Sequence, residues 1–203
     1  MVRKGLAPAV PYVAVGVGLL ALHNAWAAIL GYHIGMVIVV WSSEQVSARE
    51  TLRANGWRVP IIAAFVGASS GISLYLLWPL LSAPSDAGSV IRGMGLTEET
   101  WPLFLGYLVM VNPWIEEYYW RGYLGSADNR PVVNDFLWAG YHLIVLWGKI
   151  GVVWLVVVFL AVAAGAWFWR QANRWGGGLL PSAVSHFAAE ITIVLAIYWA
   201  LGG

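Results

Sequence analysis

Long apolar segments follow one another along almost the whole chain, and they limit the folds that it can adopt. Each segment has about 17–24 residues, and a helix of that length can cross a hydrocarbon core about 30 Å thick. The sequence therefore predicts an all-α, polytopic membrane helix bundle with about seven transmembrane helices. We expect these spans at 7–23, 25–42, 59–82, 101–124, 133–148, 150–169 and 179–201.

The supply of charged residues agrees with a membrane protein. Hydrophobic residues make up 60% of the chain and charged residues 10%, whereas soluble domains carry roughly 25% charged residues. We therefore expect the lipid bilayer to be a partner. The net charge of +1 offers no basic stripe for phosphates, which argues against nucleic acid as a partner. Cysteine is absent, which excludes disulfides and a cysteine-bound zinc.

The N-terminal apolar stretch, residues 6–42, is too long for one span and divides best at His23-Asn24. Its beginning resembles a signal peptide, but hydrophobicity continues without pause past Ala27, and we interpret it as a retained first span. The polar segment 43–58 is expected to form a surface or interfacial helix.

Residues 83–100 are expected to form a loop with a short helix opened by Thr97. No repeat or second domain is visible. The chain is interpreted as one membrane domain, with N-terminal spans and a polar segment in 1–99 and a four-helix core in 100–203.

The distribution of Lys and Arg predicts the orientation, because cytoplasmic loops carry an excess of these residues. Arg92 and Lys149 fall outside if seven spans start from a cytoplasmic N-terminus. Nine others then fall inside: Arg3, Lys4, Arg49, Arg53, Arg58, Arg121, Arg130, Arg170 and Arg174. A single long first span with an external N-terminus would give seven against four. Both topologies place the loops after Arg121 and Arg170 in the cytoplasm, and with them the opening of the candidate site.

Six ionisable side chains lie within the last four apolar segments, where each is costly to bury. A helix rises by about 1.5 Å per residue. On this basis, three of the expected helices each place one of these side chains about 10–14 Å from the cytoplasmic end of the helix. Spacings of four residues also place two pairs on single helix faces. The six are Glu116, Glu117, Arg121, His142, His186 and Glu190. The remaining histidines, His23 and His33, are interpreted as helix–helix hydrogen-bonding residues.

Two kinds of chemistry suit these residue types. A carboxylate beside an imidazole can deprotonate a water that attacks an amide or ester carbonyl, and a second imidazole can donate to the oxyanion. Alternatively, Glu116, His142, His186 and Glu190 could bind a divalent metal such as zinc. The His-Glu-x-x-His spacing that is typical of zinc hydrolases is absent.

Three motifs resemble those of the CPBP intramembrane proteases, the family that includes the CAAX prenyl endopeptidases and bacteriocin-immunity proteins. Residues 116–122 resemble the Glu-Glu-x-x-x-Arg-Gly signature, and Trp138 with His142 resembles the second motif, with Trp where Phe is usual. The third motif is similar to 165–170 with Arg174, then 179–181 and His186. Together the motifs cover about residues 100–200.

The resemblance implies an endopeptidase that hydrolyses a membrane-anchored or prenylated protein. It implies that Glu116 is the base working with His142, and that His186 contributes to the oxyanion site. Glu117 and Arg121 would form a supporting ion pair beside the supporting aromatic residue, Trp138.

Glu190 departs from the family pattern, because Asn or Asp is usual at its position. An ionised Glu190 would repel an oxyanion, so it would be protonated, bind a metal, or mark an altered chemistry. Two alternatives stay open: a non-proteolytic accessory or binding subunit of a membrane complex, or an immunity protein; and an enzyme acting on a lipid or isoprenoid.

Overall fold

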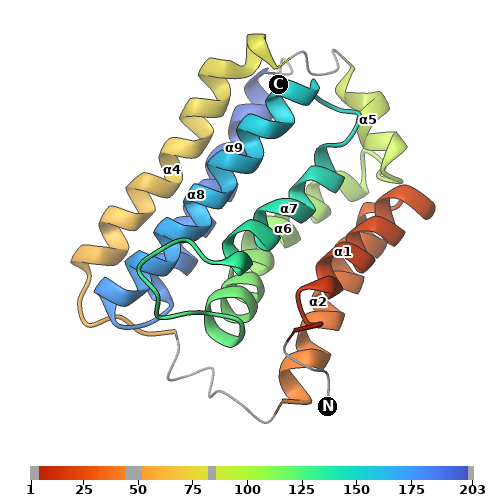
Figure 1. Ribbon diagram of the computed structural model, residues 1–203. Helices are drawn as coiled ribbons and strands as arrows, with labels where there is room; N and C mark the ends of the chain where they lie inside the picture. The colour runs from red at the N-terminus through yellow and green to blue at the C-terminus, as the bar shows by residue number, and fades with distance from the viewer. Residues whose placement is uncertain (1–4, 44–51, 82–85, 201–203) are drawn as a thin grey trace.

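The computed structural model describes residues 5–43, 52–81 and 86–200, and the regular secondary structure of these residues is all helical (Figure 1). Two π-helical turns, Val17–Ala21 and Tyr118–Tyr123, extend α1 and α6, and a 3₁₀ turn, Trp78–Leu80, extends α4. The α-helices of the described residues are α1 (Ala9–Gly16), α2 (Ala25–Trp41), α4 (Arg58–Leu77), α5 (Ala87–Gly93), α6 (Thr100–Glu117), α7 (Val133–Leu146), α8 (Val152–Gly176) and α9 (Leu180–Ala200).

Within the described residues, three helices are long and apolar enough to cross a membrane: α4 with its 3₁₀ turn, α8 and α9. The apolar helices α2 and α1, the latter with its π-helical turn, are shorter. The prediction of an all-α protein with membrane-spanning helices is confirmed to that extent.

The predicted break in the first apolar stretch is confirmed. Helix α2 begins at Ala25 because the side chain of Asn24 caps it, accepting a hydrogen bond of 2.9 Å from the backbone of Ala27. His23 adopts a left-handed conformation with a φ of 48° and is exposed. The interpretation of His23 as a helix–helix hydrogen-bonding residue is therefore wrong, whereas His33 does join two helices.

The helices form two groups with α6 and α7 between them (Figure 1). On one side α4 packs along α9, and α8 contacts α7, α4 and α9. On the other side α1 and α2 form a hairpin against α7 and α6. The backbones of α4 and α9 approach closely where Gly67 faces Ser185 and Gly71 faces Thr192, since a Cβ atom at either glycine would collide with the facing helix.

Three expectations about the connections need correction. Residues 52–57 are not helical, while residues 44–51 of the expected surface helix lie outside the described part. The short helix between spans is α5, which begins earlier than Thr97 because the Asp86 side chain accepts a hydrogen bond of 3.1 Å from the backbone of Ser89. Helix α8 continues to Gly176, so Arg170 and Arg174 lie in its last turns and not in a loop.

Candidate functional site

The six predicted ionisable residues come from three helices that meet in the middle of the bundle. Glu116 and Glu117 end α6, Arg121 follows in the π-helical turn, His142 lies on α7, and α9 carries His186 with Glu190. Burial is nearly complete for Glu116, Glu117 and His186, which are 1%, 0% and 5% exposed. Charges this deeply buried need partners, and the neighbouring side chains supply them.

Neutral donors from α7 hold the Glu116 carboxylate. The Trp138 indole N–H donates to Oε2 at 3.0 Å, and the Tyr141 hydroxyl donates to Oε1. The Tyr32 hydroxyl of α2 lies near the same carboxylate and accepts a hydrogen bond of 2.8 Å from the Trp120 indole N–H. Because Trp138 and Tyr141 are donors, they stabilise Glu116 as an ionised acceptor.

His186 lies among three carboxylates. Its Nδ1 atom is 3.1 Å from Glu117 Oε1, and its Nε2 atom is 3.5 Å from Glu190 Oε1 and 3.8 Å from Glu116 Oε2. The imidazole ring stacks on Trp169 with the ring centres 4.5 Å apart. Each ring nitrogen faces a carboxylate, and a proton on both nitrogens makes both contacts favourable. The geometry is that of a buried imidazolium.

Glu117 and Arg121 form a buried ion pair on one helix face. Arg121 Nη1 lies 3.2 Å from Glu117 Oε1, and the guanidinium stands over the Trp138 ring at 4.1 Å. The π-helical turn places Arg121 back over the end of α6 instead of towards the surface. Trp138 therefore touches both the cation and the Glu116 carboxylate, which suits a supporting aromatic residue.

His142 lies beside this cluster and is partly exposed. Its Nδ1 atom is 3.0 Å from the backbone oxygen of Trp138, and its ring stacks on Tyr141 at 4.2 Å. The structure thus brings Glu116 and His186 within 3.8 Å of each other, whereas His142 contacts Trp138 and Tyr141 of its own helix.

The Asp135–Arg170 ion pair, also buried, fixes the start of α7, which carries Trp138 and His142. Arg170 binds both carboxylate oxygens, with Nε to Oδ1 at 3.1 Å and Nη2 to Oδ2 at 2.8 Å. The same guanidinium binds the backbone oxygens of Asp128 and Arg130 in the loop before α7. This bidentate pair sets the position of α7 relative to α8.

Some residues of the site and its support belong to no motif. They include Tyr141, Asp135 and Asn112, whose amide nitrogen donates to Glu190 Oε1 at 2.6 Å. Asn112 stands four residues before Glu116 in an apolar run, and Asp135 lies within an expected span. Burying a polar group in an apolar segment is costly, so the presence of each of these two residues there could have indicated a functional or structural role. Tyr141 offers no signal, because tyrosine is ordinary in a chain rich in aromatic residues.

The four candidate metal ligands do not fit a metal centre. Within the described residues, no three His, Asp or Glu side chains are grouped so that they could hold a metal ion. Glu116 and Glu190 face the same nitrogen of His186, as in an ion pair, whereas a ligating nitrogen directs its lone pair at the metal. His142 directs Nδ1 at a backbone oxygen.

Some buried polar atoms of the cluster form no hydrogen bond within the described structure. They are Oε2 of Glu117, Oε2 of Glu190, and Nη1 and Nη2 of Arg121, although Nη1 takes part in the ion pair. Buried polar groups are almost always hydrogen-bonded. These atoms are therefore acceptors and donors that a water or a substrate carbonyl can use.

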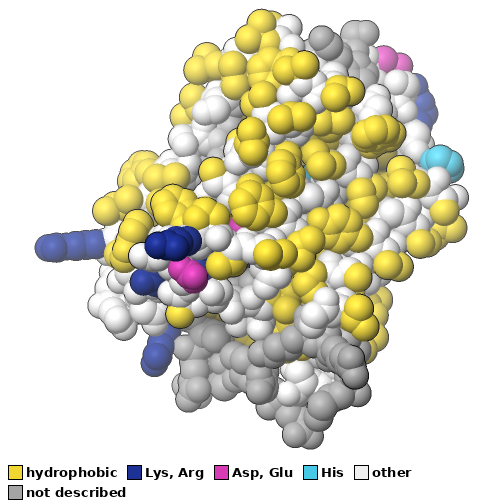
Figure 2. Space-filling model, viewed as in Figure 1, with side chains coloured by type: hydrophobic (Ala, Val, Ile, Leu, Met, Phe, Trp, Pro, Cys, Tyr) yellow, Lys and Arg dark blue, Asp and Glu magenta, His cyan; other side chains and the backbone are white. Residues whose placement is uncertain are grey.

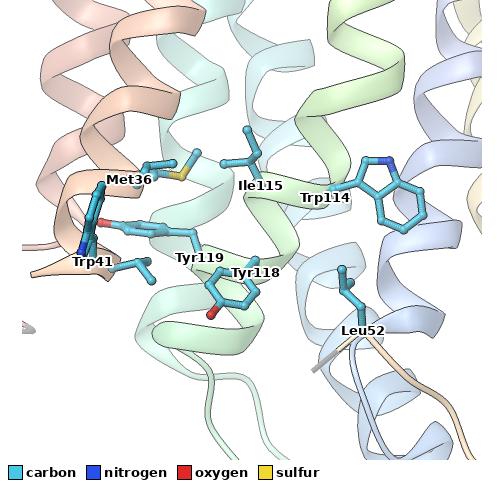
Figure 3. A pocket seen from close by; sticks show the side chains of 9 residues that line it. Met36, Trp41, Leu52, Trp114, Ile115, Tyr118 and Tyr119 are labelled. Carbon is cyan, nitrogen blue, oxygen red and sulfur yellow. The ribbon is translucent and has the colours of Figure 1, made fainter. Parts of the chain in front are cut away.

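An apolar pocket of about 440 Å³ lies between α2 and the end of α6 (Figure 3). Met36 and Trp41 of α2 face Ile115 and Tyr119 across it, as Figure 3 shows. Glu116 directly follows Ile115 in the chain. The full lining is Met36, Val37, Val40, Trp41, Leu52, Trp114, Ile115, Tyr118 and Tyr119. The size and the apolar lining suit a hydrocarbon chain.

Comparisons of the chain with protein-family models, with curated proteins and with solved structures found no match. Fold and site therefore define an all-α protein, with helices that could span a membrane, around a buried cluster of carboxylate, imidazole and guanidinium groups.

Proposed function

We propose that the chain is an integral membrane protein with about seven transmembrane helices and a cytoplasmic N-terminus. Hydrophobic side chains are spread over the face seen in Figure 2, and the few charged side chains lie mainly on its left side and at its upper right edge. Phe65 on α4 and Val152 and Val153 on α8 are each more than 70% exposed. Surfaces of this kind are stable against lipid and costly in water. The excess of Lys and Arg on one side supports the orientation.

We further propose that the protein is an intramembrane endopeptidase of the CPBP type. The observation that carries this proposal is the convergence of Glu116, Glu117, Arg121 and His186 in one buried cluster. Each of these residues belongs to a motif that resembles the family signature. Burying this many charged groups is costly, and joining helices does not require it.

In the proposed reaction, Glu116 takes a proton from a water whose oxygen adds to the scissile carbonyl carbon. His142 assists in orienting that water from its partly exposed position. His186, as an imidazolium, donates to the oxyanion that develops on the carbonyl oxygen. The proton held by Glu116 then passes to the amide nitrogen, the C–N bond breaks, and a carboxylic acid and an amine leave.

The apolar pocket supports a substrate with a hydrocarbon anchor. It lies near Trp41, at the end of α2 that the proposed topology places at the cytoplasmic side, so a prenylated or acylated protein could enter laterally from the bilayer. The same pocket favours a second candidate, an enzyme that acts on a lipid or isoprenoid. A third role, as an accessory or immunity protein, would need no intact base.

The test uses the purified full chain in proteoliposomes with a farnesylated peptide, whose cleavage is read by mass spectrometry. Wild-type protein should cleave an amide bond, and Glu116→Gln should be slower by at least about 100-fold, the usual effect of losing a general base. Glu98→Gln, a change at an exposed position, should keep the wild-type rate.

Two other outcomes would contradict the endopeptidase. Release of fatty acid from the vesicle lipids alone, lost in Glu116→Gln, would assign the site to the lipid enzyme. Equal rates for wild type and Glu116→Gln would show that Glu116 is not the base.

A further inference from the structure

A chain of hydrogen bonds connects α2 to Glu190 through α6. The hydroxyl of Tyr107 is 2.7 Å from His33 Nδ1, and His33 Nε2 is 2.9 Å from Asn112 Oδ1. Asn112 Nδ2 then donates to Glu190 Oε1 at 2.6 Å. His33 and Asn112 are buried, at 3% and 6% exposure. The chain enters the cluster at Glu190, where the motif pattern usually has Asn or Asp.

The donors and acceptors of this chain can be ordered from one end to the other. Because the amide N–H of Asn112 is directed at Glu190, its Oδ1 atom is the acceptor that faces His33. His33 must then carry its proton on Nε2, which leaves Nδ1 to accept from the Tyr107 hydroxyl. Every donor therefore points towards Glu190, and the chain ends on a carboxylate oxygen that accepts.

We propose that His33 and Asn112 are positioning residues that hold Glu190 as an ionised acceptor beside His186. This role rests on the proposed hydrolytic function, in which His186 is the oxyanion donor. Glu190 Oε1 receives the Asn112 amide and lies 3.5 Å from His186 Nε2. Glu190 is thus a charge partner that keeps His186 cationic.

This assignment explains how Glu replaces Asn without removing the chemistry. An ionised Glu190 would repel an oxyanion that it touched, but its negative charge is shared between the imidazolium of His186 and the amide of Asn112. Charge-assisted hydrogen bonds of this kind are roughly twice as strong as neutral ones. A side chain at position 112 that cannot donate would remove this support.

The tautomer of His33 tests the orientation directly and does not depend on activity. The full chain, labelled with ¹⁵N-histidine and held in nanodiscs, should show His33 neutral with the proton on Nε2. The loss of one set of ring signals in His33→Gln assigns them among the four histidines. A proton on Nδ1 would reverse the chain, make Glu190 the donor, and overturn the proposal.

The rate of peptide cleavage provides a second test of the proposal. In His33→Gln the amide nitrogen can replace Nε2 as the donor to Asn112, so its cleavage rate should stay within about threefold of wild type. His33→Leu and Asn112→Leu should each be slower by about tenfold or more, through a lower kcat at similar KM. His23→Asn, at the exposed left-handed turn, is the matched control and should behave as wild type.

The two tests separate the failure of this inference from that of the proposed function. If wild-type protein cleaves and His33→Gln is as slow as His33→Leu, the chain does not position Glu190 and the inference fails. If wild-type protein cleaves nothing, the hydrolytic function fails. The tautomer of His33 alone then decides whether the chain positions Glu190.

Discussion

Two adjacent glutamates in this protein have different surroundings. Glu117 faces the cations Arg121 and His186, whereas Glu116 is held mainly by neutral donors. The spacing of four residues predicts the pairing of Glu117 with Arg121, because both lie on one helix face. The donors to Glu116 come from α7, more than 20 residues along the chain, and a single sequence does not show which faces of two helices will meet.

The ion pair of Glu117 and Arg121 should contribute strongly to stability. Arg121→Ala should lower the free energy of unfolding in detergent by about 3–5 kcal/mol, because it removes one partner of a buried pair. Arg92→Ala removes one partner of an exposed pair, with Asp86 3.8 Å away, and should cost less than about 1 kcal/mol. Equal losses in the two variants, measured by chemical denaturation, would show that the buried pair is not formed.

At the scale of helices, hydrophobic segments predict most of the elements but not all their ends. The break before α2 is predictable, because Asn24 interrupts an apolar run and caps the next helix. The end of α8 is not, because hydropathy falls at Arg170 while the helix continues to Gly176. Arg170 can remain inside the helix because Asp135, from a distant segment, neutralises it. Tertiary pairing of this kind leaves no local signal.

The close approach of α4 and α9 gives a second stability prediction. Gly67→Ala would place a Cβ atom against the backbone oxygen of Ser185, so the helices must separate, at a cost of about 1–3 kcal/mol. Gly106→Ala on α6 meets no atom within 4 Å and should stabilise the helix by about 0.5–1 kcal/mol. Thermal unfolding of both variants in the same detergent compares them, and a shift of the same sign would contradict this packing.

For the whole molecule, the structure places side chains of the N-terminal part in contact with the part that carries the motifs. The motif residues lie in 100–203, yet α2 places Tyr32 near Glu116 and contributes His33 to the chain that ends at Glu190. The motifs predict Glu116, Glu117, Arg121 and His186 as one cluster because their order and depth agree. The contribution of α2 could not be predicted, since no motif connects it to the core.

The measurement that tests the account most directly is a map of protein termini in membranes of cells that make wild-type protein, Glu116→Gln or Glu98→Gln. We predict a set of new termini, next to lipid anchors or apolar segments, that appears with wild type and Glu98→Gln and is missing with Glu116→Gln. Identical sets of termini in all three membranes would contradict the claim that the buried glutamates form a hydrolytic site.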